Sequence, residues 1–155
     1  MNDENDKSVY SFGVLAFVEG LLEQGELEMA RMEIARLDRK ILKEPHYSRA
    51  ANINAYLDAS TNPGKEVALR LTKSTQSLID QIETMNLGTR WYVPRAIERT
   101  IKAFETLGVD SDVKIWTQKL TDVNVRIREL SPKQIKAPTT ESTNADKNFK
   151  NDETN

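Results

Sequence analysis

The sequence predicts an all-α domain of about six helices, paired as three antiparallel hairpins and followed by a disordered polar tail. Apolar residues recur at helical spacing through most of the chain. Turn residues separate these segments at Gly25, at residues 62–64 and at Gly108. Nowhere does a sustained alternation of apolar and polar residues indicate a strand.

Three helices are predicted in the first half of the domain. The first begins at Ser8 and ends at Gly25, where glycine suits a left-handed C-terminal cap. The second carries its apolar stripe over residues 27–41, so that the two helices form a hairpin. The third begins near Pro45, since proline is tolerated in the first turn of a helix, and its apolar pattern is short and weak.

The second half shows stronger helical patterns. A fourth helix carries an apolar stripe over residues 67–85, and a fifth opens at Pro94 and ends at Gly108. The sixth has the most regular pattern and follows N-capping residues at 110–112. Its apolar positions, which place a tryptophan in the core, are Val113, Trp116, Leu120, Val123, Ile127 and Leu130.

Composition sets the limits of the domain. Residues 131–155 are rich in polar and charged residues and contain almost nothing to bury, which predicts disorder. Residues 1–7 are polar as well and are predicted to be disordered, so the helical domain is expected to span residues 8–130.

Charge and cysteine content narrow the classes of function. The formal net charge is −2, so no general attraction to nucleic acid or to an anionic membrane follows. The absence of cysteine excludes disulfides and thiolate chemistry. The acidic N-terminus is unlike a secretion signal, and no apolar run approaches the ~20 residues of a membrane span. We expect a cytoplasmic protein without a membrane partner.

The first hairpin resembles a tetratricopeptide repeat. In that family two short helices meet at a tight turn, as at Gly25, and small residues such as Ala16 and Ala30 allow close packing. The turns of this chain lie further apart than the ~34 residues of that family. The resemblance implies a concave surface that binds a peptide or another protein. Both a repeat-like stack and a compact bundle are compatible with the pattern.

Known catalytic arrangements are not found in the sequence. His46 is the only histidine, and its neighbours do not suggest activation, so we interpret it as a surface or capping residue. The chain contains no Glu-x-x-His pair, and its six glycines form no phosphate-binding loop. We predict no enzyme activity, no cofactor and no metal site; an enzyme without a recognisable motif is the remaining alternative.

Residues 89–95 are predicted to form a loop, and they are the most suggestive of binding, because two large aromatic residues stand among cations there. Basic residues continue along one face of the following helix. The candidate binding residues are Arg90, Trp91, Tyr92, Arg95, Arg99 and Lys102. Three interpretations of the aromatic pair are open: it covers the edge of the core, contacts a protein or peptide, or stacks on nucleic-acid bases.

The sequence therefore favours a non-enzymatic helical interaction module, which is an adaptor, assembly factor or small regulator that binds another protein or peptide. The alternative is a nucleic-acid-associated regulator that uses residues 90–102. The apolar run at residues 14–18 also leaves a homo-oligomer open.

Overall fold

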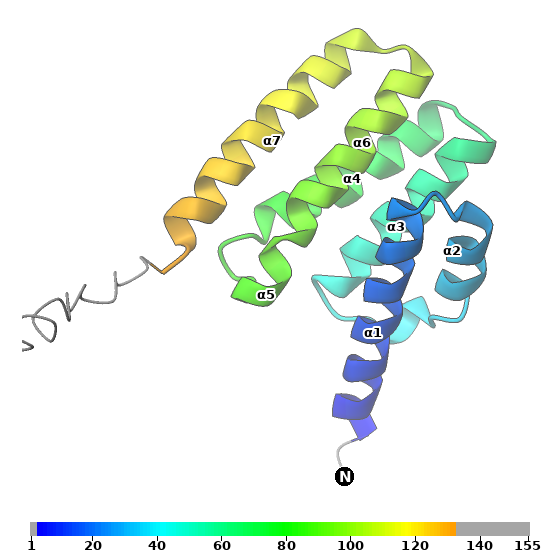
Figure 1. Cartoon of the computed structure of the whole chain (residues 1–155), viewed down its shortest axis with the longest axis vertical. Coiled ribbons are helices and arrows are strands. Elements are labelled where there is room, and N and C mark those ends of the chain that lie inside the picture. Colours follow the sequence, from blue (N-terminus) through cyan, green and yellow to red (C-terminus); the bar gives the residue numbers. More distant parts are fainter. Residues whose placement is uncertain (1–2, 133–155) are drawn as a thin grey trace, which may run out of the picture.

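Six helices of eight residues or more pair in chain order into three antiparallel hairpins, in a computed structural model that describes residues 3–132 (Figure 1). The hairpins are α1 (Asp3–Glu23) with α2 (Leu27–Ile34), α3 (His46–Thr61) with α4 (Lys65–Asp80), and α6 (Tyr92–Leu107) with α7 (Asp110–Leu130). A one-turn helix, α5 (Leu87–Arg90), precedes α6, and a 3₁₀ helix spans Arg39–Ile41. The described residues contain no strand, which confirms the predicted all-α fold and its three hairpins.

Helix α3 lies at the centre of this arrangement, in contact with α1, α2, α4 and α6. Half of its residues are therefore buried: Ser48, Arg49, Ala50, Asn52, Ile53, Ala55, Leu57 and Ala59. A helix enclosed by neighbours has no broad polar face. Central burial is thus the reason for the weak apolar pattern of this segment in the sequence.

The apolar side chains form three adjoining clusters. The first joins α1, α2 and α3 around Leu15 and Ile53, and the second joins α4, α6 and α7 around Leu78 and Trp116. A small third cluster that includes Leu71 joins α3, α4 and α6. The predicted burial of Trp116 is confirmed, since only 3% of it is exposed.

The left-handed cap predicted at Gly25 is confirmed, and the helix end predicted at Gly108 has the same geometry. Gly25 and Gly108 have φ values of 75° and 72°, in the left-handed region that glycine adopts without a steric penalty. After each glycine the backbone N–H bonds back into the last helical turn, from Glu26 to the carbonyl of Leu21 (2.9 Å) and from Val109 to that of Phe104 (3.1 Å). These bonds are those of the Schellman motif, which ends a helix sharply.

The helix boundaries differ from the prediction at several places. Helix α4 ends at Asp80 and not near residue 85, and α6 begins at Tyr92 and not at Pro94. Helix α1 begins at Asp3, so residues 3–7, predicted to be disordered, are helical. The acidic composition of this end suits the positive end of a helix dipole. Helix α2 ends at Ile34 and not at Ile41, because the Asp38 carboxylate accepts a hydrogen bond from the backbone N–H of Lys40 (3.0 Å) and stabilises a turn.

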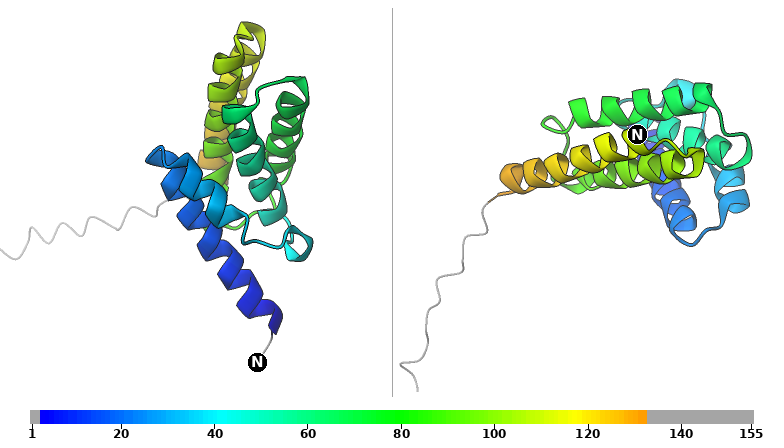
Figure 2. Two further views of the ribbon diagram at one scale, coloured as in Figure 1. Left: turned by 90° about the vertical axis from the view of Figure 1, so that its right-hand side faces the viewer. Right: turned by 90° about the horizontal axis from the view of Figure 1, so that it is seen from above.

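Two further findings concern the ends of the molecule. The N-terminal part of α1 extends beyond the other helices (Figure 2). Within residues 3–132 no helix combines the length and the apolar composition needed to cross a bilayer. Disorder was predicted for residues 131–155. Of these, residues 133–155 lie outside the described part of the chain.

Candidate functional site

The predicted loop at residues 89–95 is helical, because α5 and α6 meet there with only Trp91 between them. Trp91 has helical backbone angles, and the residue is 42% exposed. Tyr92 is 2% exposed, and the centroids of the two rings are 3.8 Å apart. The ring of Tyr92 therefore belongs to the core, whereas Trp91 packs on it and keeps an exposed face.

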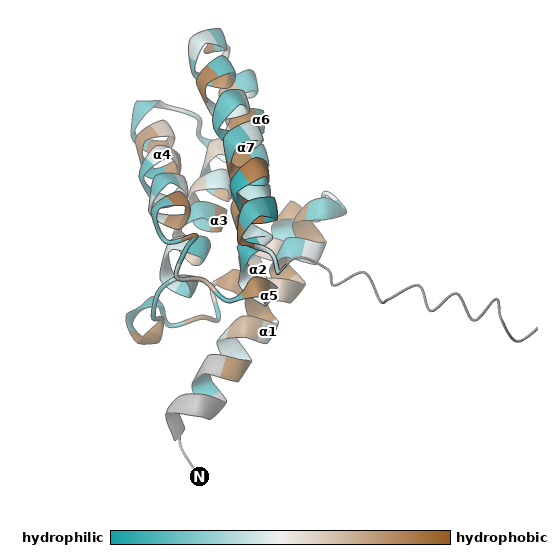
Figure 3. Ribbon diagram, turned by 90° about the vertical axis from the view of Figure 1, so that its left-hand side faces the viewer, coloured by the Kyte–Doolittle hydropathy of each residue, from teal (hydrophilic) through white to brown (hydrophobic). Residues whose placement is uncertain are grey.

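A third aromatic residue joins this pair from the first helix. The ring of Phe12 lies 6.2 Å from that of Tyr92, and Phe12 is 41% exposed. Val9 and Leu87 are exposed one helical turn away from Phe12 and Trp91, respectively, and extend the apolar area. We refer to Val9, Phe12, Leu87 and Trp91 as the aromatic surface. Figure 3 shows apolar residues, in brown, on both α1 and α5.

Arg90 has partners within the fold. Its Nε donates a hydrogen bond to the carbonyl of Ile82 (3.0 Å), and its Nη1 donates to the carbonyl of Leu130 (3.3 Å). Carbonyl groups at helix C-termini lack intrahelical donors, and basic side chains satisfy them well. Arg90 thus ties the turn after α4 to the end of α7.

The other predicted cations are also directed to different places. Arg95 forms an ion pair with Glu23 at the end of α1. Arg99 is largely buried and donates from Nε to Asn52 Oδ1 (2.9 Å). Burial lowers the pKa of Arg99, and the nearby Glu19 opposes this effect. Lys102 is exposed. Because the predicted cations differ in their partners and in their exposure, they do not form one continuous basic face.

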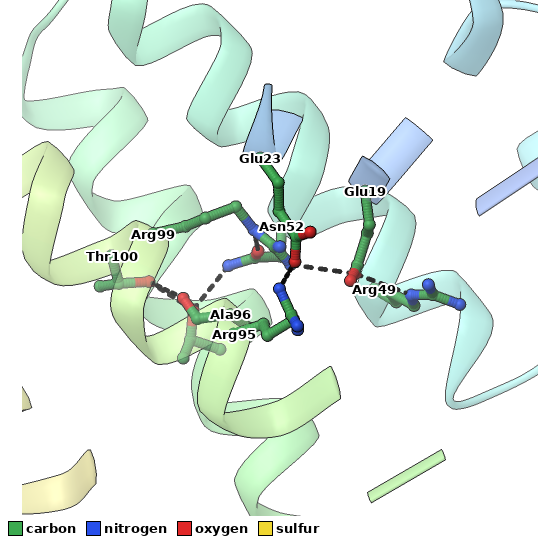
Figure 4. Close-up of polar contacts among 9 residues, drawn as sticks. Glu19, Glu23, Arg49, Asn52, Arg95, Ala96, Arg99 and Thr100 are labelled. Atoms are coloured by element: carbon green, nitrogen blue, oxygen red, sulfur yellow. Dashed lines mark hydrogen bonds and ion pairs between the residues drawn. The ribbon is translucent and has the colours of Figure 1, made fainter. Parts of the chain in front are cut away.

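Below the aromatic surface lies a group of charged residues, of which only Arg99 was predicted as a site residue from the sequence. Glu19 Oε1 accepts hydrogen bonds from Arg49 Nε (2.9 Å) and from Arg99 Nη2 (3.3 Å), as Figure 4 shows. Only 3% of Glu19 and 1% of Arg49 are exposed. The Arg49 guanidinium also stacks on the Tyr92 ring, 3.2 Å from its centroid. We refer to Glu19, Arg49 and Arg99 as the buried ion cluster.

A chain of neutral hydrogen bonds extends from this cluster into the core. Asn52 Nδ2 donates to Thr75 Oγ1 (2.8 Å), which lies 2.8 Å from Thr100 Oγ1. Because the Thr100 hydroxyl donates to the carbonyl of Ala96 (2.9 Å), it accepts from Thr75. The chain links α3, α4 and α6, and it satisfies polar groups that would otherwise be costly to bury.

Several polar atoms next to the cluster have no hydrogen-bond partner among the described residues. They are Glu19 Oε2, Arg49 Nη1 and Nη2, the Tyr92 hydroxyl and His46 Nδ1. Burial raises the pKa of Tyr92, while Arg49 lowers it, so the hydroxyl is protonated at neutral pH. A buried polar atom without a partner destabilises a fold by about 1–3 kcal/mol. Such a concentration of them in one place is unusual.

A groove lies beside the cluster, between α1 and α6. One hollow of about 220 Å³ is lined by both acidic and basic side chains, among them Glu19, Glu23, Arg95 and Arg99. An adjoining hollow of about 280 Å³ shares the lining residues Leu22, Tyr56 and Lys102 and is more apolar. Because the charges of the first hollow are balanced, the groove does not by itself select an anion or a cation.

His46 packs at the edge of this region, with its ring centroid 5.9 Å from that of Phe12. Its pKa lies below the usual value of 6.5, chiefly because the ring is partly buried and secondly because Arg49 is close; Glu44 acts in the opposite direction. His46 is thus neutral at pH 7 and gains a charge less readily in the folded state than in the unfolded state.

This lowered pKa predicts a loss of stability in acid. The unfolded state binds the proton more tightly than the folded state. The contribution of neutral His46 to the free energy of unfolding is therefore complete above about pH 6.5 and declines as the pH falls below that value. Urea unfolding between pH 7.5 and pH 5 should show this decline. In His46→Phe, which keeps an aromatic ring and cannot titrate, the pH dependence should be shallower. Equal pH dependence in both proteins would contradict the assignment.

Comparisons of the chain with protein-family models, with curated proteins and with solved structures found no match. The tetratricopeptide-repeat resemblance of the first hairpin therefore stays a prediction. Within the described part of the chain, no three His, Asp or Glu side chains are grouped so that they could hold a metal ion. The candidate functional site is the aromatic surface together with the buried ion cluster below it.

Proposed function

We propose that this chain is a non-enzymatic interaction module, an adaptor, assembly factor or small regulator of the cytoplasm, that binds another protein through its aromatic surface. The observation that carries the proposal is the exposure of Phe12 and Trp91, about two fifths of each residue, while both rings pack against the buried Tyr92. Aromatic residues that are held by the fold and keep an exposed face provide much of the binding energy in protein interfaces.

The positions of the cations favour a protein partner over nucleic acid. Binding to phosphates requires basic side chains that are free to approach the backbone. Arg90 donates to backbone carbonyls, Arg95 is paired with Glu23, and Arg99 is buried beside Glu19. Of the four cations predicted for a basic face, this leaves only Lys102 exposed without a described ion pair.

Trp91→Ala tests the proposal. The exposed part of the ring predicts that the variant loses only about 1 kcal/mol of stability, whereas a captured partner should bind about 30-fold more weakly, equivalent to ~2 kcal/mol. Partners captured from the native host by the wild-type protein are titrated against both proteins. Unchanged affinity for every captured partner would remove Trp91 from the binding surface.

A matched control and a salt series complete this test. Ile115 on α7 is 52% exposed and lies outside the aromatic surface, so Ile115→Ala should leave partner affinity unchanged. A nucleic-acid partner would show a steep fall in affinity as salt rises. A protein partner held by apolar contacts should show little change over the same range.

A further inference from the structure

We propose that the buried ion cluster receives one carboxylate from the partner protein, the side chain of an Asp or Glu that enters beneath the aromatic surface. The inference rests on the proposed function and specifies the chemistry of the partner. It depends on three features of the structure: an excess of positive charge, hydrogen-bond donors without acceptors, and the position of both below the exposed rings.

The charge count gives the first argument. Glu19 carries one negative charge, and Arg49 and Arg99 carry one positive charge each, so the buried ion cluster has one positive charge in excess. A buried charge without a counter-charge is strongly destabilising. One monovalent anion would balance the cluster, whereas a phosphate dianion would leave it with a negative excess.

The free donors give the second argument. Arg49 Nη1 and Nη2 are buried and meet no carboxylate or carbonyl acceptor in the described part of the chain, and the Tyr92 hydroxyl beside Arg49 has no acceptor either. Figure 4 shows the Arg49 guanidinium directed away from Asn52 and Arg99. Two Nη groups in one plane match the two oxygens of a carboxylate. A shift that paired Glu19 Oε2 with one Nη group would satisfy a single donor and leave the charge count unchanged.

The position of these donors gives the third argument. The Arg49 guanidinium stacks on Tyr92 and lies 5.9 Å from the centroid of the Trp91 ring. Phe12 contacts the edge of Tyr92 from the other helix. Because Trp91 and Phe12 are partly exposed, rotation of their side chains would open a path to Arg49. A partner segment that fits this surface carries one acidic residue with apolar residues on both sides of it. The acidic residue would reach Arg49, and the apolar residues would cover Val9 and Leu87.

Acetate, the simplest carboxylate, is the probe for this site. In the full chain carrying Trp116→Phe, Trp91 is the only tryptophan, and its fluorescence should change saturably with sodium acetate. Sodium chloride at equal ionic strength should not produce this change. Tyr92→Phe, which removes only the hydroxyl group, should weaken acetate binding about tenfold. Arg49→Lys, which keeps the charge but loses the fork, should abolish it.

Two further measurements separate this inference from the proposed function. Arg95→Gln is the control, because Arg95 lies 5.2 Å from the Trp91 ring and could itself attract acetate. The inference would be overturned if Arg95→Gln lost the fluorescence change with acetate while Tyr92→Phe kept it. An equal fluorescence change with chloride would overturn it as well. Acetate should also release a captured partner more readily than chloride does. Partner binding that depends on Trp91 but is unaffected by Tyr92→Phe and by acetate would overturn the carboxylate site and leave the protein-binding proposal intact.

Discussion

Replacement of Glu19 by leucine should lower the free energy of unfolding by about 3–5 kcal/mol, because removal of one partner from a buried ion pair leaves the other charge without compensation. Two arginines are affected here, since Glu19 Oε1 is the acceptor for both Arg49 and Arg99. Urea unfolding at pH 7 measures the change. Acetate should restore part of the lost stability, since the variant has two buried positive charges in excess.

The next turn of the same helix offers a control. Glu23 pairs with Arg95 at the surface, and about half of each side chain is exposed. Exposed ion pairs contribute about 0–1 kcal/mol, so Glu23→Leu should have little effect. The double variant Glu19→Leu/Arg49→Met should recover part of the stability lost by Glu19→Leu, because it removes one unpaired charge. Equal costs for the changes at Glu19 and Glu23 would show that the cluster does not stabilise the fold.

Features governed by nearby residues were predictable from the sequence. The left-handed cap at Gly25, the helix end at Gly108 and the regular stripe around Trp116 depend on a few neighbouring positions, and the structure confirms them. The role of α3 was not predictable in the same way. Its residues contact several other helices, and the more completely a helix is surrounded, the less its sequence shows one apolar face.

The candidate site was only partly visible in the sequence, because most of its contacts join distant parts of the chain. The pairing of Trp91 with Tyr92 is local and was expected, whereas Phe12 and Arg49 reach the same place from other helices. One signal pointed to the cluster: Glu19 falls within the apolar stripe of the first helix. A charged residue at such a position requires a buried partner, but the sequence does not say which one.

Local side-chain chemistry also explains the end of the second helix. The apolar spacing continues to Ile41, and periodicity alone extends the helix that far. The carboxylate of Asp38 instead bonds to the backbone of Lys40 and favours a turn, so Ile41 becomes exposed. Asp and Asn compete with helical hydrogen bonds in this way, and within an otherwise regular stripe their effect is easily overlooked.

The second large effect is expected at Trp116, whose replacement by alanine should lower the free energy of unfolding by about 3–5 kcal/mol, as for other buried aromatic residues. The ring joins α7 to the core between α4 and α6, and Lys119 lies over it, 4.4 Å from its centroid. Because α7 packs mainly on α6, its amide hydrogens should exchange faster in the variant, while those of the enclosed α3 are less affected. Ile115→Ala, one position away and exposed, should change stability by less than about 0.5 kcal/mol. Similar losses in Trp116→Ala and Ile115→Ala would mean that α7 does not pack on the core through Trp116.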